Sequence, residues 1–188
     1  MGVIGDVKDP NVARQHPADY LEGLELTVRA AMLEAGVEPA KVVGIGVDAT
    51  ASTPLPVDAQ GQALALTDAF KEDPDAMAWL WKDHSSLVEA NEITAKAAAL
   101  RPEYLAKCGG TYSSEWYWSK ILHCARVAPK VNAAAHDWIE LPDWIPFVLT
   151  GQLKRCLCAA GHKGLYCPDW GGYPCLLYTS PSPRDKTV

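Results

Sequence analysis

The pattern of apolar and polar positions predicts a long amphipathic helix near the start of the chain. Between residues 19 and 35, apolar side chains recur at steps of three and four positions, as one face of an α-helix requires. Asp19 and Glu22 have the spacing of an N-terminal capping pair, and Gly36 follows as a stop signal. We therefore expect an amphipathic helix over 19–35.

Three further segments carry helix signals, each with a polar residue near its start. Their expected bounds are Ser86 to about Leu100 with Glu89 as capping partner, about Ser114 to Val127, and Asp143 to a glycine stop at Gly151.

A valine-rich run at residues 42–47 predicts a buried strand, because it is short, continuously apolar and bounded by Pro39 and Asp48. The polar residues Thr50 and Ser52 follow it. In open α/β sheets, ligands bind at the carboxyl ends of strands, so this loop is an expected place for a site.

A hairpin is expected next, with strands at 55–57 and 63–64. Asp58 opens the turn between them and Gly61 closes it. Helices and strands together predict a mixed α/β fold.

Composition and charge limit the partners of this chain. With 188 residues, 48% of them hydrophobic, it can form one domain with a core. A net charge of −6 without a dense lysine/arginine cluster argues against nucleic acid and membrane partners. There is no apolar run long enough to span a bilayer and no signal-peptide pattern, so we expect a cytoplasmic protein whose six cysteines are reduced thiols. A small molecule is the expected partner.

Residues 158–164 carry the strongest signal for a binding site. Glycines on both sides of the His162-Lys163 pair let the backbone approach a ligand, while the flexible ammonium of Lys163 reaches its oxygens. Trp81 can pack its indole on the apolar face of a sugar, and Asp83 can accept hydrogen bonds from sugar hydroxyls. The alternatives are a solvated surface lysine and a core tryptophan.

Three more residues complete the predicted substrate site. The small side chain of Ala51 lets the backbone of its loop face a ligand, Asp48 helps to shape the same loop, and Glu115 can accept hydrogen bonds from hydroxyls. The alternatives are strand-end hydrogen bonding for Asp48 and a first-turn helix carboxylate for Glu115.

Several segments, in their order and spacing, resemble the FGGY carbohydrate kinases, and among these the ribulokinases of arabinose breakdown. They are residues 44–54, 80–84, 112–116, 138–151 and 158–172. The resemblance implies a ribonuclease-H-like (actin-like ATPase) sugar-kinase N-terminal domain, incomplete at both ends, that holds a ketose against a second domain. It also implies transfer of a phosphoryl group from ATP, with Mg²⁺, to O5 of L-ribulose. In this family the lysine of the Gly-His-Lys motif, here Lys163, contacts the ketose, and the loop of Ala51 faces the sugar.

The resemblance divides the chain into three parts. Residues 1–14 correspond to the remnant of a variable loop, 15–174 to the sugar-binding domain, and 175–188 depart from the family. The last part is Ser/Pro-rich and is interpreted as a non-native tail, with a natural linker as the alternative. The family's ATP-phosphate loop is not found before Gln15, and its catalytic aspartate belongs to the second domain. We therefore expect no catalytic residue, no tightly bound ATP or Mg²⁺ and no activity in this chain alone, while the complete enzyme is compatible with a homo-oligomer.

Other functions compete with this interpretation. Cys156, Cys158, His162 and Cys167 have the residue types of a structural zinc site, but two cysteines separated by one residue differ from the usual zinc-binding pair. We therefore expect no metal. The remaining alternatives are an FGGY kinase for another pentulose or pentitol, and a non-catalytic sugar- or zinc-binding module.

Overall fold

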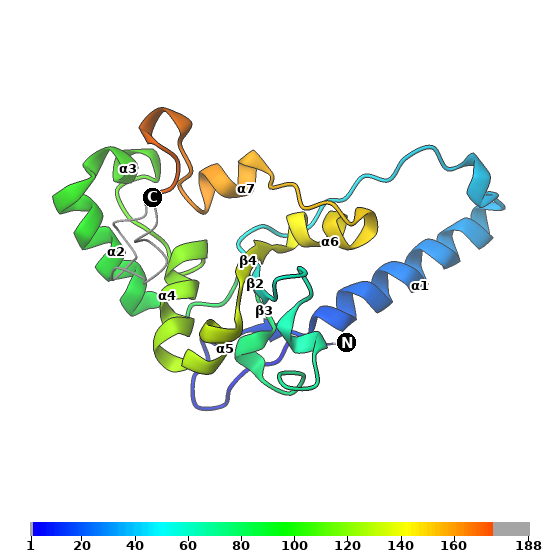
Figure 1. The fold of residues 1–188 in the computed structure, drawn as a ribbon, viewed down its shortest axis with the longest axis horizontal. Helices are drawn as coiled ribbons and strands as arrows, with labels where there is room; N and C mark the ends of the chain where they lie inside the picture. The colour runs from blue at the N-terminus through cyan, green and yellow to red at the C-terminus, as the bar shows by residue number, and fades with distance from the viewer. Residues whose placement is uncertain (1, 175–188) are drawn as a thin grey trace.

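The structure is a computed structural model that describes residues 2–174. Two short antiparallel sheets lie at the centre of the molecule (Figure 1). One sheet pairs β1 (Arg14–Gln15) with β3 (Ala78–Trp79), and the other pairs β2 (Pro54–Val57) with β4 (Asp137–Glu140). In the second sheet Leu55 lies opposite Ile139, and both are fully buried. This sheet places the end of β4 beside the chain that enters β2.

Helices surround the sheets on several sides. They are α1 (Pro17–Ala35), α2 (Leu87–Leu100), α3 (Pro102–Lys107), α4 (Tyr117–Val127), α5 (Pro129–Ala134), α6 (Leu141–Thr150) and α7 (Leu157–His162). Short 3₁₀ turns are η1 (Pro39–Lys41), η2 (Leu64–Leu66), η3 (Pro74–Ala76) and η4 (Pro168–Trp170). In the part of the chain that the structure describes, no helix is long and apolar enough to cross a membrane.

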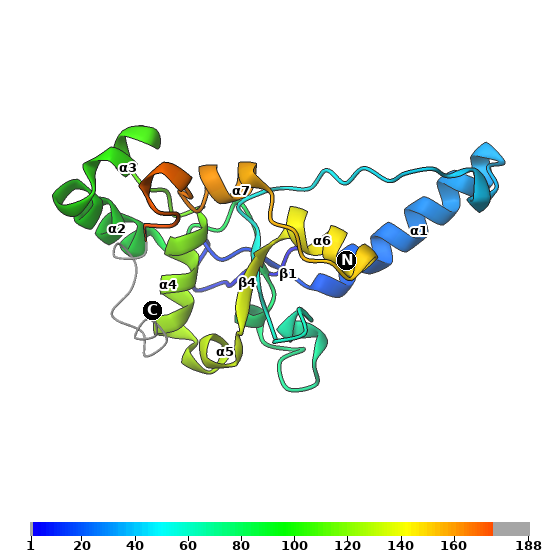
Figure 2. The same ribbon diagram turned by 45° about the horizontal axis from the view of Figure 1, so that its top comes forward.

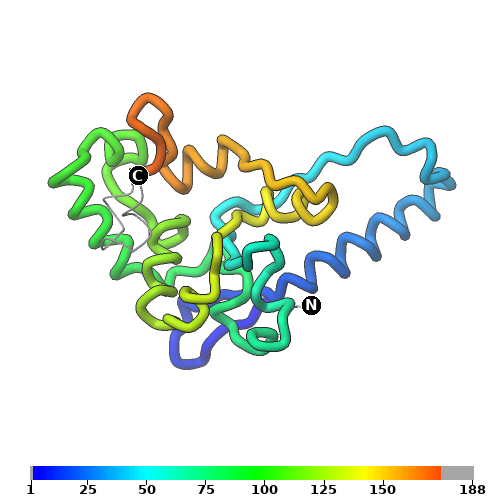
Figure 3. Tube along the Cα trace, viewed as in Figure 1, coloured from blue at the N-terminus to red at the C-terminus, as the bar shows by residue number. Residues whose placement is uncertain are grey.

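Helix α1 projects from the rest of the molecule, and the segment after it returns in an extended conformation (Figures 2 and 3). The predicted helix is confirmed and ends at Gly36, whose φ of 62° is left-handed. The predicted capping pair is wrong, because the His16 ring accepts from the amide of Ala18 while Asp19 accepts from the amide of Gly2. A proline in the first turn favours this earlier start.

The predicted buried strand at 42–47 is wrong. Val43 is 102% exposed and Ile45 67% exposed, and the described chain provides no backbone hydrogen bond from residues 43–51 to a neighbouring strand. An apolar run becomes a strand only where another strand pairs with it, since its amides and carbonyls must otherwise bond to water.

Helices α2, α4 and α6 confirm the three other helix predictions within about three residues at their starts. The predicted stop at Gly151 is confirmed, since this residue has a left-handed φ of 70°. The predicted side-chain caps at the helix starts are wrong. The Ser86 hydroxyl donates to the carbonyl of Ser114, Glu89 accepts from Arg126, and Asp143 accepts from the amide of Cys156. These polar groups therefore join separate elements instead of closing their own helices.

The predicted hairpin turn is confirmed, since the amide of Gly61 bonds to the carbonyl of Asp58 at 3.1 Å. Its second strand is reduced to one bridge, between Val57 and Ala63, before η2 begins. The sequence signals missed α3, α5 and α7, and α7 contains the first part of residues 158–164. The predicted tail at 175–188 lies outside the described residues.

Candidate substrate-binding site

The loop that carries Ala51 runs from an exposed start into the core. Asp48 is exposed and Ala51 is half-buried, whereas Ser52 and Thr53 are buried. Ser52 adopts a left-handed conformation with φ of 63°, a strained value for a residue with a side chain. The loop therefore turns sharply just after Ala51, and its backbone is accessible at that residue.

Residues 80–83, here called the Trp81 turn, contain two residues of the predicted site, Trp81 with an exposed side chain and Asp83 with a buried one. The Trp81 indole is 50% exposed, while Asp83 is fully buried. The Asp83 carboxylate accepts from Arg14, from the amide of Ala13 at 2.6 Å and from the hydroxyl of Ser85 at 2.6 Å. Both its oxygens thus have partners within the chain, so its contact with a sugar stays a prediction and its observed action is to shape the turn.

Glu115, two residues before α4 begins, lies beside His84. Its carboxylate is 3.8 Å from Nε2 of His84, and Nδ1 of His84 lies 3.0 Å from the hydroxyl of Ser114. Glu115 remains partly exposed and is available to accept a hydrogen bond from a ligand.

Lys163 lies at the C-terminal end of α7, half-buried above α4. Its ammonium is 5.6 Å from the centroid of the Trp116 ring, and its carbonyl accepts from the hydroxyl of Tyr112 at 2.7 Å. The backbone is also fixed at Gly164, where an added Cβ would lie 2.9 Å from the carbonyl oxygen of Ala160. The backbone at Lys163 is therefore held in place while its side chain extends over Trp116.

Two buried charged residues that the sequence signals missed connect these parts. Lys120, on α4, is 0% exposed, and its ammonium donates to the carbonyls of Ser52 and Leu80, both at 2.7 Å. Glu140, at the end of β4, is 3% exposed and accepts from the amide of Thr53 at 2.8 Å. One signal for Lys120 was available, because it lies four residues after Trp116 on a helix face that is otherwise apolar.

Burial dominates the electrostatics of these two groups. It lowers the pKa of Lys120 and raises the pKa of Glu140, because a low-dielectric interior disfavours both charged forms. Each charge opposes the shift of the other, so the pair is electrostatically coupled. Lys163 also acts on the pKa of both groups, which places its charge near this cluster.

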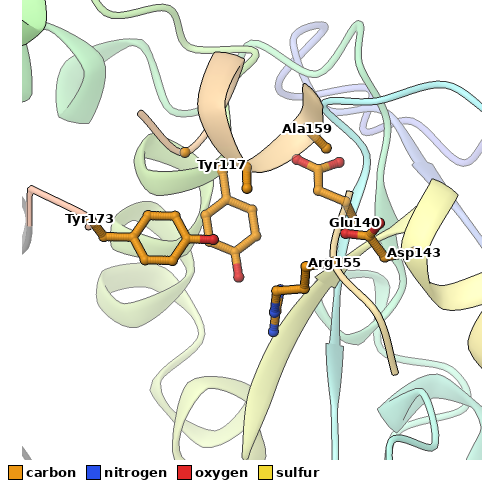
Figure 4. Close-up of a pocket in the computed structure, with 8 residues that line it drawn as sticks. Tyr117, Glu140, Asp143, Arg155, Ala159 and Tyr173 are labelled. Atoms are coloured by element: carbon orange, nitrogen blue, oxygen red, sulfur yellow. The ribbon is translucent and has the colours of Figure 1, made fainter. Parts of the chain in front are cut away.

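A small cavity lies against α7, where Ala159 and Ala160 line it (Figure 4). Its volume of about 10 Å³ suits one water molecule. Glu140 and Asp143 line one side of it, with Tyr117 and Tyr173 on the other (Figure 4). One oxygen of Glu140 is buried and has no hydrogen-bond partner among residues 2–174. The cavity is too small for a sugar.

The four residues of the zinc alternative do not come together. Within residues 2–174 no group of three or more His, Cys, Asp or Glu side chains has the arrangement of a metal site. The ammonium of Lys107 lies 3.3 Å from the sulfur of Cys167. Cys156 and Cys158 are exposed free thiols.

Sequence comparison connects this arrangement with sugar kinases. The chain is 41% identical over 168 residues to a ribulokinase from Vibrio parahaemolyticus. The aligned segment covers 86% of this chain and 30% of the relative. It is 41% identical over 166 residues to a ribulokinase from Geobacillus thermodenitrificans, with 88% and 29% covered. The chain therefore spans about 30% of the length of these relatives. No family model matches the chain.

Structure comparison confirms the fold class. A ligand-bound xylulose kinase from Lactobacillus acidophilus matches with a TM-score of 0.71 at 15% identity, over 94% of this chain and 33% of that one. At this identity the likeness shows the fold alone. The predicted ribonuclease-H-like sugar-kinase fold is thus confirmed, and the relatives confirm the resemblance to the FGGY carbohydrate kinases.

Proposed function

We propose that this chain, which belongs to the ribulokinase group of sugar kinases over the length that matches, is the sugar-binding part of an ATP-dependent kinase for L-ribulose. The reaction is phosphorylation at O5, a step of arabinose breakdown. One observation carries the proposal. The ammonium of Lys163 lies over the ring of Trp116, the residue that follows Glu115, while the loops of Ala51 and Trp81 are joined by Lys120.

In this proposal the described residues bind and orient the ketose. Lys163 donates a charge-assisted hydrogen bond to a sugar oxygen, and the backbone at Ala51 faces the sugar. Trp81 packs on its apolar face, while Asp48 and Glu115 accept from its hydroxyls. Asp83 contributes through the turn that it shapes. Holding the ketose in one orientation is what these residues supply to the rate.

The transfer itself needs groups that the described residues do not provide. The O5 oxygen attacks the γ-phosphorus, the bond to ADP breaks, and a base takes the O5 proton. The resemblance to the FGGY kinases puts the catalytic aspartate in the second domain and the ATP-phosphate loop outside the matched segment. We therefore assign ATP, Mg²⁺ and the catalytic aspartate to the remainder of the kinase.

The wider features are also part of the proposal. The division into 1–14, 15–174 and 175–188 is retained, with residues 175–188 as a non-native tail. The partner is a small ketose, with no nucleic acid or membrane, and the complete enzyme is compatible with a homo-oligomer. Because ATP is the phosphate donor, we place the reaction in the cytoplasm.

A chimeric enzyme tests the proposed function. Residues 15–174 of this chain replace the matching segment of the Vibrio parahaemolyticus ribulokinase, and ADP release is measured with L-ribulose, D-ribulose, D-xylulose and ribitol. The expected result is ATP-dependent turnover with the highest kcat/KM for L-ribulose. A preference for another pentulose or for ribitol would assign the chain to a kinase for that sugar. A folded chimera without turnover on any of the four would overturn the proposal.

A further inference from the structure

Lys120 is the most deeply buried ammonium near the site, and its contacts are unusual for a core lysine. It is 0% exposed, and its donors go to main-chain carbonyls: Ser52 and Leu80 at 2.7 Å and Trp79 at 3.4 Å. An unpaired charge in this position would cost several kcal/mol, so the contacts must compensate its desolvation. The charge is thus used to hold backbone, not side chains.

The carbonyls that Lys120 holds belong to the two loops of the proposed sugar site. Ser52 directly follows Ala51, and Leu80 directly precedes Trp81. These loops are distant in sequence and have no strand pairing to each other, since β2 pairs with β4 and β3 with β1. Lys120 therefore supplies a direct link between the backbone at Ala51 and the Trp81 turn.

Glu140 fixes the same loop from the other side. Its carboxylate accepts from the amide of Thr53, while Lys120 donates to the carbonyl of Ser52. Both polar groups of the peptide that follows the left-handed residue Ser52 are therefore anchored. A strained backbone conformation persists only where its surroundings determine it. The charged groups that act on Lys120 are Glu140 and Glu115, which favour its charge, and Arg14 and Lys163, which oppose it.

We propose that Lys120, with Glu140 as its partner, is a positioning residue that holds the Ala51 loop and the Trp81 turn at the distance that sugar binding requires. This inference rests on the proposed function for its consequence in catalysis. Its structural part, the tying of two loops by one ammonium, does not depend on any activity. A core lysine that merely contributed to stability would loosen the whole domain when removed, whereas a positioning lysine loosens these two loops first.

Amide hydrogen exchange on this chain tests the structural part. In Lys120→Met, the amides of Thr53, Leu80 and Asp83 should exchange at least about tenfold faster relative to amides of α2. In the unmutated chain, local opening of these two loops has to break the hydrogen bonds of the Lys120 ammonium, and in the variant that free-energy cost is absent. The matched control is Cys124→Ser, which changes a 0% exposed residue one turn further along α4 that belongs to a hydrophobic core cluster.

If Lys120→Met does not fold, Lys120→Gln retains one donor and should show a smaller change in the same three amides. Equal acceleration of all amides, or the same pattern in Cys124→Ser, would overturn the inference, because the residue would then act on global stability alone.

Kinetics of the chimera test the catalytic part. Lys120→Met should lower kcat/KM for L-ribulose by about a hundredfold, with a raised KM for the sugar and an unchanged KM for ATP, because misplaced loops affect sugar orientation. Cys124→Ser should leave both KM values unchanged. Equal changes in both KM values would overturn the positioning role. If the unmutated chimera is inactive, the proposed function fails, while the exchange result still decides whether Lys120 ties the loops.

Discussion

Replacing Lys163 by methionine separates a sugar contact from a packing role. Methionine keeps most of the apolar stem and removes the charge. The backbone contacts of Lys163 should survive, since the hydroxyl of Tyr112 bonds to its carbonyl and not to its side chain. The only side-chain partner in the described structure is the Trp116 ring, 5.6 Å from the ammonium. Most of the expected effect therefore falls on ligand binding.

The two expected magnitudes differ enough to be distinguished. A lost charge-assisted hydrogen bond to a sugar costs about 1.5 to 3 kcal/mol, which is roughly ten- to a hundredfold in kcat/KM. The cation–π contact at a half-exposed position contributes about 0.5 to 1 kcal/mol to stability at most. In the chimera, coupled ADP release should thus show the large loss, while urea unfolding without ligand should show a change of about 1 kcal/mol or less.

Lys130→Met is the matched control, because Lys130 is an exposed lysine on α5 outside the proposed site. It should alter neither kcat/KM nor stability. If Lys163→Met leaves kcat/KM for L-ribulose unchanged, the interpretation of residues 158–164 as a substrate contact is refuted. If it lowers kcat/KM only in proportion to lost folded protein, the lysine acts through packing.

Three further predictions concern stability, thiol reactivity and activity. Gly61→Ala should lower the free energy of unfolding by at least about 2 kcal/mol, because Gly61 has φ of +79° and an added Cβ would clash with the Phe147 ring. Urea unfolding measures it, and a loss below about 0.5 kcal/mol would contradict the prediction. In native protein, iodoacetamide should label the exposed Cys156 and Cys158 but not Cys124, because burial raises the pKa of Cys124 to about 12. Mass spectrometry of the peptides measures the labelling, and labelling of Cys124 in native protein would show that the core is open. The chain alone should show no L-ribulose-dependent ADP release, since it spans about 30% of its relatives and the catalytic base is assigned to another part of the kinase. Measurable turnover would reverse that assignment.

The helices were predictable because their signals are local. Periodic apolar positions and a following glycine indicated α1, and a polar residue near the start of an apolar pattern was enough to locate α2 and α4. The side-chain caps at the helix starts were not predictable in the same way, because Ser86 and Asp143 have partners in distant segments that compete with their own helix ends. A polar residue near a helix start thus indicates the helix better than it indicates its own bonds.

The strand at 42–47 failed for a different reason. Its sequence fits a buried strand, but strand formation depends on a neighbour that the run itself does not specify. The same limit applies to the site. The motifs indicated Lys163, Ala51 and Trp81 one by one, whereas their connection through Lys120 depends on carbonyls from two separate loops, and carbonyls carry no sequence signal.

Two kinds of residue shape the proposed site: Lys163, which is proposed to contact the sugar, and Lys120 with Glu140, which hold the backbone of its loops. Lys163 reaches it from the end of α7 and is expected to affect only the sugar that it contacts. Lys120 and Glu140 hold the peptide that joins Ser52 to Thr53, so a change there is expected to alter the positions of the residues proposed to contact the sugar. Since burial disfavours both of their charges, neither residue is favourable by itself, and each is stabilised by the hydrogen bonds and the opposite charge that the other loop elements provide. Specificity for the ketose should therefore depend on Lys120 as strongly as on Lys163, although only one of the two is positioned to contact it.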